Sequence, residues 1–280
     1  MAKRNILVSP FVKWVGGKRQ LIPEILEHLP QDIQKYKYIE PFIGGGAVFF
    51  HLQLKNAIIN DFNEELINVY SVIRDQLDEL IADLSMHKND SDYFYKLRNV
   101  DRTPRFKKLS PVQRASRIIY LNKTCYNGLY RVNNSGEFNS PFGRYKNPNI
   151  INGPTLKAVS KYLNTSNVTI CCGDYREVLK KATKSSFVYL DPPYHPVSDS
   201  ANFTGYIQGG WTMEDQIKLR IECDKLNQRG VKFLLSNSAT DFIREQYKNY
   251  TISTVRATRA INSNPSNRGE VEELLVQNYE

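Results

Sequence analysis

The chain has 280 residues, a formal net charge of +9 and 41% hydrophobic side chains. These values suit a globular protein with one large or two small domains and exclude disorder as its main state. The sequence has no apolar run long enough to cross a membrane, and the run at residues 6–8 is too short for a signal peptide. The four cysteines form no CxxC pair, so we expect a cytoplasmic protein without a metal centre or a disulfide scaffold.

The first sixty residues predict an alternation of helices and strands. Helical spacing ends at Pro30, a short strand pattern ends at Pro41, and a buried strand pattern ends at Asp61. A glycine-rich turn precedes the second helix. The predicted elements are a helix over 21–29, a strand over 37–40, a helix from the glycine turn to about 54, and a strand over 57–60.

The rest of the chain predicts more helices and then a return to strands. Alternating strands and helices are typical of βαβ units and a mostly parallel sheet. The predicted elements are two or three helices to about residue 100, helices over 111–122, 156–163 and 214–228, and strands over 168–171, 187–190, 232–235, 250–255 and 271–277. We expect an α/β fold whose main domain comprises residues 1–62 and 164–280, with a mostly helical second domain inserted over 63–163.

The positive charge is concentrated in one part of the chain. Residues 102–173 carry 12 Lys and Arg side chains and a single acid, Glu137, whereas the remainder is slightly acidic. Asn, Arg and aromatic residues are interleaved there, and residues 132–138 have the pattern of a β-hairpin turn. Arg and Asn can bond base edges, and a hairpin fits the major groove. A nucleic-acid surface is the preferred interpretation, with a solvated basic face as the alternative.

A second signal lies in the glycine turn and the acid that follows it. Gly44 and Gly46 stand between a strand and a helix, where glycine lets a ligand approach the backbone. Asp61 ends the next strand and suits a ribose diol. Together they indicate an adenosine-containing ligand. The alternative is that Asp61 only caps the helix that begins near Glu64.

The sharpest signal is Asp191-Pro192-Pro193-Tyr194, directly after an apolar strand. Two prolines fix the backbone and remove two N–H donors. The segment is left with a carboxylate, carbonyl acceptors and an aromatic ring, which suit a planar group that carries an exocyclic amine. The alternative is a plain turn with a buried tyrosine.

Two weaker features complete the set. Trp14 and Lys18 flank a glycine turn that suits a carboxylate or phosphate, although an exposed lysine before a helix is the simpler interpretation. The four histidines show no metal-ligand spacing, and we expect them to be structural or surface residues. His195 directly follows the Asp-Pro-Pro-Tyr motif.

Five segments in this order resemble Dam-type (D12 class, alpha group) DNA adenine-N6 methyltransferases. They are KWVGGK, EPFIGGGAVFF, NDFN, YNGLYRVN with GEFNSPFGRYK, and DPPY. The resemblance runs over nearly the whole chain, and the combination is specific although each piece alone is not. It implies a Rossmann-like sheet that binds S-adenosylmethionine (SAM), with a target-recognition domain inserted. The implied activity is methyl transfer from SAM to the N6 of a flipped-out adenine in double-stranded DNA, within the palindrome GATC.

The resemblance also assigns residues to roles. Catalysis falls on Asp191, Pro192, Pro193 and Tyr194, with Tyr194 stacked on the adenine and its amine held by the Asp191 side chain and the Pro192 carbonyl. The implied cofactor residues are Trp14, Lys18, Phe42, Gly44, Gly46, Asp61, Asp174, Tyr175 and Asp191, and Lys18 would pair with the methionine carboxylate. The implied DNA-binding residues are Lys13, Tyr126, Asn127, Leu129, Arg131, Pro141 and Tyr145, with Arg131 and Lys13 reaching guanines and Tyr126 wedging into the duplex.

Three other functions are compatible with parts of these patterns. A SAM-dependent RNA methyltransferase would keep the chemistry and change the substrate. A non-catalytic DNA-binding protein would keep the basic surface, although the intact Asp-Pro-Pro-Tyr motif argues against it. A restriction nuclease would need a carboxylate and lysine cluster for metal-assisted cleavage, which we do not find. A cognate restriction endonuclease acting on the same site is a candidate partner.

Overall fold

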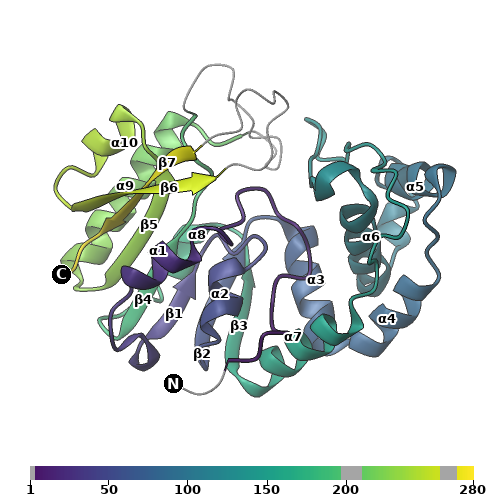
Figure 1. Cartoon of the computed structure of the whole chain (residues 1–280), viewed down its shortest axis with the longest axis horizontal. Helices are drawn as coiled ribbons and strands as arrows, with labels where there is room; N and C mark the ends of the chain where they lie inside the picture. Colours follow the sequence, from purple (N-terminus) through teal and green to yellow (C-terminus); the bar gives the residue numbers. More distant parts are fainter. Residues whose placement is uncertain (1–3, 197–209, 259–269) are drawn as a thin grey trace.

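The computed structural model describes residues 4–196, 210–258 and 270–280. In these ranges the strands form one seven-stranded sheet with the order β3-β2-β1-β4-β5-β7-β6 (Figure 1). All neighbouring pairs are parallel except those of β7, which is antiparallel to both β5 and β6. The strands are β1 (Lys37–Glu40), β2 (Asn56–Asp61), β3 (Asn167–Cys172), β4 (Ser186–Leu190), β5 (Lys232–Ser238), β6 (Thr251–Thr258) and β7 (Glu270–Gln277). The mostly parallel sheet and all seven predicted strands are confirmed.

The helices connect these strands. They are α1 (Ile22–Glu27), α2 (Ala47–Leu52), α3 (Glu64–Asp75), α4 (Leu77–Ser85), α5 (Ser91–Arg98), α6 (Pro111–Thr124), α7 (Gly153–Thr165), α8 (Tyr175–Leu179), α9 (Met213–Gln228) and α10 (Asp241–Gln246). The sequence did not predict α8 and α10, which have five and six residues and are too short for a helical period to show. Helix α1 is shorter than the predicted 21–29 because its last backbone bonds tighten to an i, i+3 pattern at His28 and Leu29.

The central strands are buried on both faces of the sheet. Alternate residues of a strand point to opposite faces, so Tyr38 packs in one hydrophobic core and its neighbour Ile39 packs in the other. The first core includes side chains from α1, α2, α3 and α7, and the second includes side chains from α8, α9 and α10. This three-layer arrangement explains why every residue of β4 is buried.

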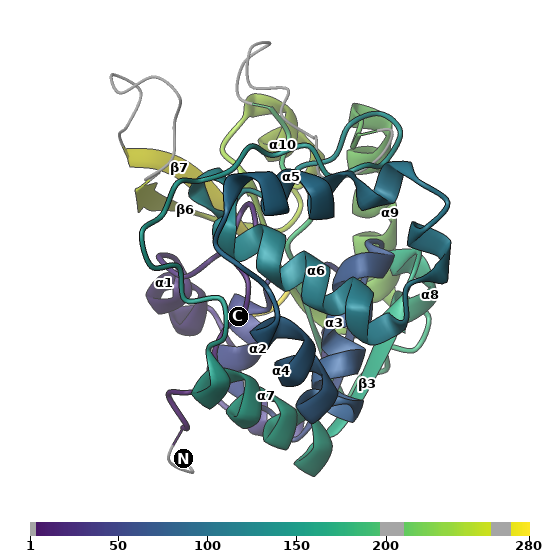
Figure 2. The same cartoon turned by 90° about the vertical axis from the view of Figure 1, so that its right-hand side faces the viewer.

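The helices between β2 and β3 extend to one side of the sheet (Figures 1 and 2). Helices α3 and α7 contact β3, whereas α6 packs on α3, α4 and α5 (Figure 2). Helix α6 begins with a capping box between Ser110 and Gln113 and with Pro111 at its first turn. Its buried residues Ile118 and Tyr120 belong to the same core as the α3 face of the sheet, so the core is continuous from the sheet into this helical region.

The basic loops that follow α6 fold back on themselves. Val132 and Phe138 form an antiparallel bridge, the Asn133 N–H donates to the Glu137 carbonyl at 2.9 Å, and Gly136 has a φ of +78°. The predicted hairpin turn is therefore present, held by a single bridge and without extended strands. A second bridge joins Cys125 to Phe142 and closes the larger loop at the end of α6.

Candidate functional site

Four polar signals from the sequence meet at one edge of the sheet. Strand β1 lies between β2 and β4, and all three are parallel, with β3 parallel on the far side of β2. The glycine turn at Gly44 follows β1, and Asp61 is the last residue of β2. Asp174 follows β3, and Asp191 follows β4. Carboxyl ends of parallel strands share one edge, and the neighbours of the first strand form a crevice there. The predicted placement of these residues at strand ends is confirmed.

The glycine turn after β1 is tied to the end of β2. The Gly44 N–H donates to Asp61 Oδ2 at 2.9 Å, and the Asn63 N–H donates to Asp61 Oδ1 at 2.9 Å. Asn63 is the residue that caps α3, since its side chain accepts from the Leu66 N–H. The alternative that Asp61 merely caps this helix is therefore wrong. Burial raises the pKa of the Asp61 carboxyl, and the backbone N–H groups oppose that shift.

Asp191 lies at the end of β4 beside a buried lysine. Lys18 Nζ is 2.8 Å from Asp191 Oδ1, and the exposed fractions of the two side chains are 6% and 17%. Ser236 from β5 donates to the same oxygen at 3.1 Å, and Lys18 also donates to the Gly16 carbonyl at 2.7 Å. Burial raises the pKa of Asp191, and the Lys18 charge opposes this. The role of Lys18 toward a methionine carboxylate stays a prediction, because in the free protein its ammonium lies on Asp191.

Two contacts fix the Tyr194 side chain, one on the face of its ring and one at its hydroxyl. The Lys18 ammonium lies 4.4 Å from the ring centroid, in cation–π geometry. The Tyr194 hydroxyl donates to Glu273 Oε2 of β7 at 2.6 Å. Asp191, Lys18 and Tyr194 thus converge on one spot, where a carboxylate, a cation and an aromatic face lie within contact distance. Sequence reasoning had assigned all three to the site but not their mutual contacts.

A polar network fixes the backbone of the Asp-Pro-Pro-Tyr segment. Gln216 of α9 donates to the Pro193 carbonyl at 2.8 Å, and Asn237 of β5 donates to Gln216 at 3.1 Å. Asn237 also accepts from the His195 N–H at 3.1 Å. The His195 ring stacks on Phe242 with centroids 4.7 Å apart. His195 therefore helps to pack the segment against α10, as expected for a structural residue.

Two of the predicted cofactor residues, Phe42 and Tyr175, pack together after β1 and β3. The Phe42 ring lies 5.1 Å from that of Tyr175 and 5.6 Å from that of Trp211, and the Trp211 Nε1 is buried without a partner among the described residues. Asp174 caps α8 and pairs with Arg176, its carboxylate partly exposed. Trp14 lies apart from these rings, beside the glycine turn.

Trp14 stacks on Tyr130 with ring centroids 4.6 Å apart. A Cβ at Gly44 would come within 2.9 Å of the Trp14 ring, so the absence of a side chain at this position lets the glycine turn approach the indole. Trp14 therefore links the glycine turn to the loop that carries the predicted DNA-binding residues.

The predicted DNA-binding residues gather around the loops after α6. Tyr126 is 57% exposed, and its N–H donates to the Pro141 carbonyl. The Arg131 guanidinium is aimed by Asn139, which accepts from its Nε at 2.6 Å. The remaining members are Lys13, Asn127, Leu129 and Tyr145, none of which is fully buried.

Lys13 reaches this surface from the N-terminus. Its backbone makes two hydrogen bonds with the Asn122 side chain of α6, at 2.9 and 2.7 Å. Lys13, Lys123 and Tyr145 line a hollow of about 250 Å³. Burial and the nearby charges of Lys13 and Arg19 lower the pKa of Lys123. No ion pair joins Lys13 or Lys123 to a described residue, and this uncompensated charge favours an anion.

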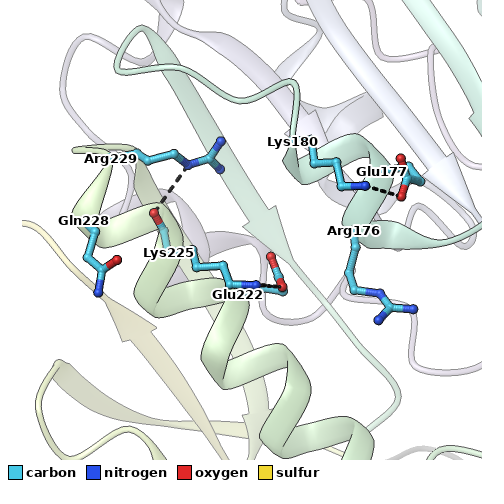
Figure 3. Close-up of a pocket in the computed structure, with 7 residues that line it drawn as sticks. All are labelled: Arg176, Glu177, Lys180, Glu222, Lys225, Gln228 and Arg229. Carbon is cyan, nitrogen blue, oxygen red and sulfur yellow. Dashed lines mark hydrogen bonds and ion pairs between the residues drawn. The ribbon is translucent and has the colours of Figure 1, made fainter.

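A larger hollow of about 650 Å³ lies between α8 and α9 (Figure 3). Its charges are already paired, Lys180 with Glu177 at 2.6 Å and Lys225 with Glu222 at 2.7 Å. Arg229 donates to the Leu179 carbonyl at the end of α8. Because these charges are paired with one another and Arg229 caps the end of α8, the hollow has a structural role. The candidate site therefore lies elsewhere.

The described ranges hold no helix that is long and apolar enough to span a membrane. Nor do they contain three or more His, Cys, Asp or Glu side chains placed together as ligands for a metal ion.

Comparison with known proteins identifies the family. The sequence profile of the D12 class N6 adenine-specific DNA methyltransferases matches residues 14–261. The chain belongs to this family. It is 44% identical to the Type II methyltransferase M1.LlaDCHI of Lactococcus lactis subsp. cremoris, with 100% of this chain and 98% of that protein covered. It is 43% identical to the Type II methyltransferase M.MjaIII of Methanocaldococcus jannaschii over 97% of this chain and 99% of that protein.

A DNA adenine methylase of Serratia marcescens is 38% identical, over 95% of this chain and 97% of that protein. The chain is thus an adenine-specific DNA methyltransferase, an enzyme of a family that acts on DNA. Its seven-stranded mixed sheet is consistent with a methyltransferase fold.

Three residues at the site escaped the sequence reasoning. Glu273 is buried in β7, and an acid among the apolar residues of a predicted strand was the signal that could have drawn attention to it. Phe62, which is 65% exposed, comes directly after Asp61 in the Asn-Asp-Phe-Asn segment, and the sequence reasoning assigned it no role. Trp211 lies just before α9, outside every predicted element, and left no periodic signal, so its contacts with Phe42 and Tyr175 are what reveal it.

Proposed function

We propose that this methyltransferase transfers a methyl group from SAM to the N6 of an adenine flipped out of double-stranded DNA, within GATC. The observation that carries the proposal is the convergence of Asp191, Tyr194 and Lys18 at the end of β4. A carboxylate beside an aromatic face suits a planar base with an exocyclic amine.

The residues at the crevice fit SAM by their chemistry. Carboxylates stand at the ends of β2 and β3, as a ribose diol and an adenine amine require, and Phe42 offers an aromatic surface. When bound, SAM would supply a methyl group on a positively charged sulfur. The residues we assign to it are Trp14, Lys18, Phe42, Gly44, Gly46, Asp61, Asp174, Tyr175 and Asp191.

Asp191 has an oxygen to spare for the substrate. Its ion-pair and hydrogen-bond partners among the described residues, Lys18 and Ser236, both contact Oδ1. Oδ2 can therefore accept one N–H of the adenine amine, and the Pro192 carbonyl can accept the other. Two such bonds would aim the N6 lone pair at the methyl group. Formation of the N6–CH₃ bond would break the S–CH₃ bond, whose electron pair would stay on sulfur. N6 would gain a positive charge and then release one proton to water.

We assign DNA recognition to residues 63–163 as an inserted domain. The residues proposed to contact DNA are Lys13, Tyr126, Asn127, Leu129, Arg131, Pro141 and Tyr145. The uncompensated cations near Lys13 and Lys123 support this assignment, because phosphates supply most of the affinity of such surfaces. Two relatives are named Type II methyltransferases, which supports a cognate restriction endonuclease that acts on the same site.

The decisive experiment supplies methyl-labelled SAM with two duplexes, one carrying a single GATC and one with that site scrambled, at fixed salt. We expect label on adenine N6 of the GATC duplex alone. Label on both duplexes would refute the site, and label on an RNA substrate instead would favour the RNA methyltransferase. Asp191→Ala should keep DNA binding and lose transfer, and turnover near that of the wild type in this variant would refute the assigned mechanism.

A further inference from the structure

Glu273 is a buried acid next to the proposed catalytic tyrosine. It lies in the antiparallel part of the sheet, opposite Ser238 of β5 and Val255 of β6, and its exposed fraction is 7%. A buried carboxylate is costly unless a donor satisfies it. The donor that the described residues provide is the Tyr194 hydroxyl, at 2.6 Å from Oε2.

The Tyr194 ring that makes this hydrogen bond also has the Lys18 ammonium over its face. A hydrogen bond from a phenol to a carboxylate is charge-assisted and short. It moves electron density toward the ring, whose face is the negative end of the aromatic quadrupole. The Lys18 ammonium sits over that face at 4.4 Å in the free protein. Burial, Asp191 and Glu273 together raise the pKa of Tyr194 well above its usual value, so the phenol keeps its proton and stays a donor.

We propose that Glu273 is a positioning residue that acts through Tyr194. It fixes the plane of the ring on which the target adenine stacks and strengthens the attraction of that ring for positive charge. During transfer the S–CH₃ electron pair stays on sulfur and the N6 lone pair forms the new bond, so positive charge moves onto the adenine. A more electron-rich ring favours that state over the neutral base. The inference rests on the proposed stacking of the adenine on Tyr194.

The test is a double-mutant cycle with a matched control. The variants are Glu273→Gln, Tyr194→Phe and their combination, and the control is Glu272→Gln, since Glu272 is exposed and adjacent in β7. Single-turnover methyl transfer isolates the chemical step, calorimetry gives the SAM affinity, and thermal unfolding reports the fold. A 2-aminopurine in place of the target adenine reports stacking by its fluorescence.

We expect each single variant to transfer methyl about 10-fold more slowly, and the double variant to be no slower than either, because all three lack the same interaction. The SAM affinity should stay within about twofold of the wild type, and the 2-aminopurine signal of both single variants should rise as stacking on the ring loosens. Glu272→Gln should match the wild type in every readout.

Two results would overturn the inference. One is an unchanged rate in Glu273→Gln. The other is an equal loss from Glu273→Gln in the wild-type and the Tyr194→Phe backgrounds, since that would place Glu273 outside the action of Tyr194. If Glu273→Gln fails to fold, an unchanged rate in Tyr194→Phe still overturns it. A wild-type enzyme that does not methylate adenine would instead refute the proposed function.

The rates are compared on the alkaline plateau of the pH profile. Asp191 faces Lys18 from the N-terminal turn, Ser236 from β5, Glu273 from β7 and Glu40 from β1. Glu273 is one of the charges that raise the pKa of Asp191, so Glu273→Gln should lower it and move the acidic limb of the profile to lower pH. At the plateau Asp191 is ionised in every variant, and this effect does not contribute.

Discussion

Removing the Lys18 ammonium should destabilise the protein by an amount that its geometry sets. Lys18 Nζ and Asp191 Oδ1 are 2.8 Å apart and both side chains are largely buried. At this separation the Coulomb attraction is about 6 kcal/mol for an effective dielectric constant of about 20. Desolvation of the ammonium offsets part of that, and losing one partner of a buried pair typically costs about 3–5 kcal/mol. We expect Lys18→Met, which keeps most of the side-chain volume, to lower the free energy of unfolding by about 3 kcal/mol at neutral pH.

This loss should depend on pH because Asp191 can respond by taking up a proton. Burial raises the pKa of Asp191 and Lys18 is the strongest opposing influence, so the variant should have a still higher pKa. A carboxyl with a raised folded pKa destabilises the folded state above that pKa, and the effect vanishes below its unfolded value of about 3.9. The deficit of Lys18→Met should therefore grow as the pH rises from the wild-type pKa to the variant pKa, and be least below both.

Denaturant unfolding at a series of pH values measures this directly. Lys35→Met is the control, since Lys35 pairs with Asp32 at the surface at 3.7 Å and is 80% exposed. Such pairs contribute less than about 1 kcal/mol. A deficit for Lys18→Met that is independent of pH, or no larger than that of Lys35→Met, would refute the reasoning.

Three further changes probe separate features. Arg117→Met should lower the free energy of unfolding by about 3 kcal/mol, because the Asp101 side chain, 9% exposed and 2.8 Å from the Arg117 guanidinium, loses its nearer cation and keeps Arg102 at 3.8 Å; a denaturation midpoint near that of the wild type would contradict this. Gly46→Ala should cost at least about 1–2 kcal/mol, because φ is +70° and the new Cβ would lie 2.6 Å from the Tyr70 hydroxyl; thermal unfolding checks it, and an unchanged midpoint would be evidence against strain at this turn. Arg131→Ala should relax discrimination at one base pair by about 1–3 kcal/mol, measured as the ratio of rates on cognate and mismatched duplexes, and an unchanged ratio would reject its role as a reader.

The sequence by itself predicted the strands and the edge of the sheet at which the site forms. Short strand patterns that end at or just before Glu40, Asp61 and Asp191 predict neighbouring strands of a parallel sheet, and parallel neighbours place their carboxyl ends together. The positions of these acids therefore followed from local pattern and from a general rule of α/β sheets. The residue types of the Asp-Pro-Pro-Tyr segment were enough to predict that it suits a planar group with an exocyclic amine.

The contacts within the site were decided only by the tertiary structure. Tyr194 and Glu273 are 79 residues apart, and the backbone of Lys13 bonds a side chain 109 residues away. No periodicity links such positions. The apolar pattern of a strand shows that the strand is buried, but nothing in the sequence shows which residue pairs with a buried acid. A buried charge needs a partner from whichever element the fold brings near it. The sequence could therefore name the carboxylate and the ring that we propose for catalysis. Only the packing of the N-terminal turn and of β7 against β4 and β5 placed Lys18 on Asp191 and Glu273 on Tyr194.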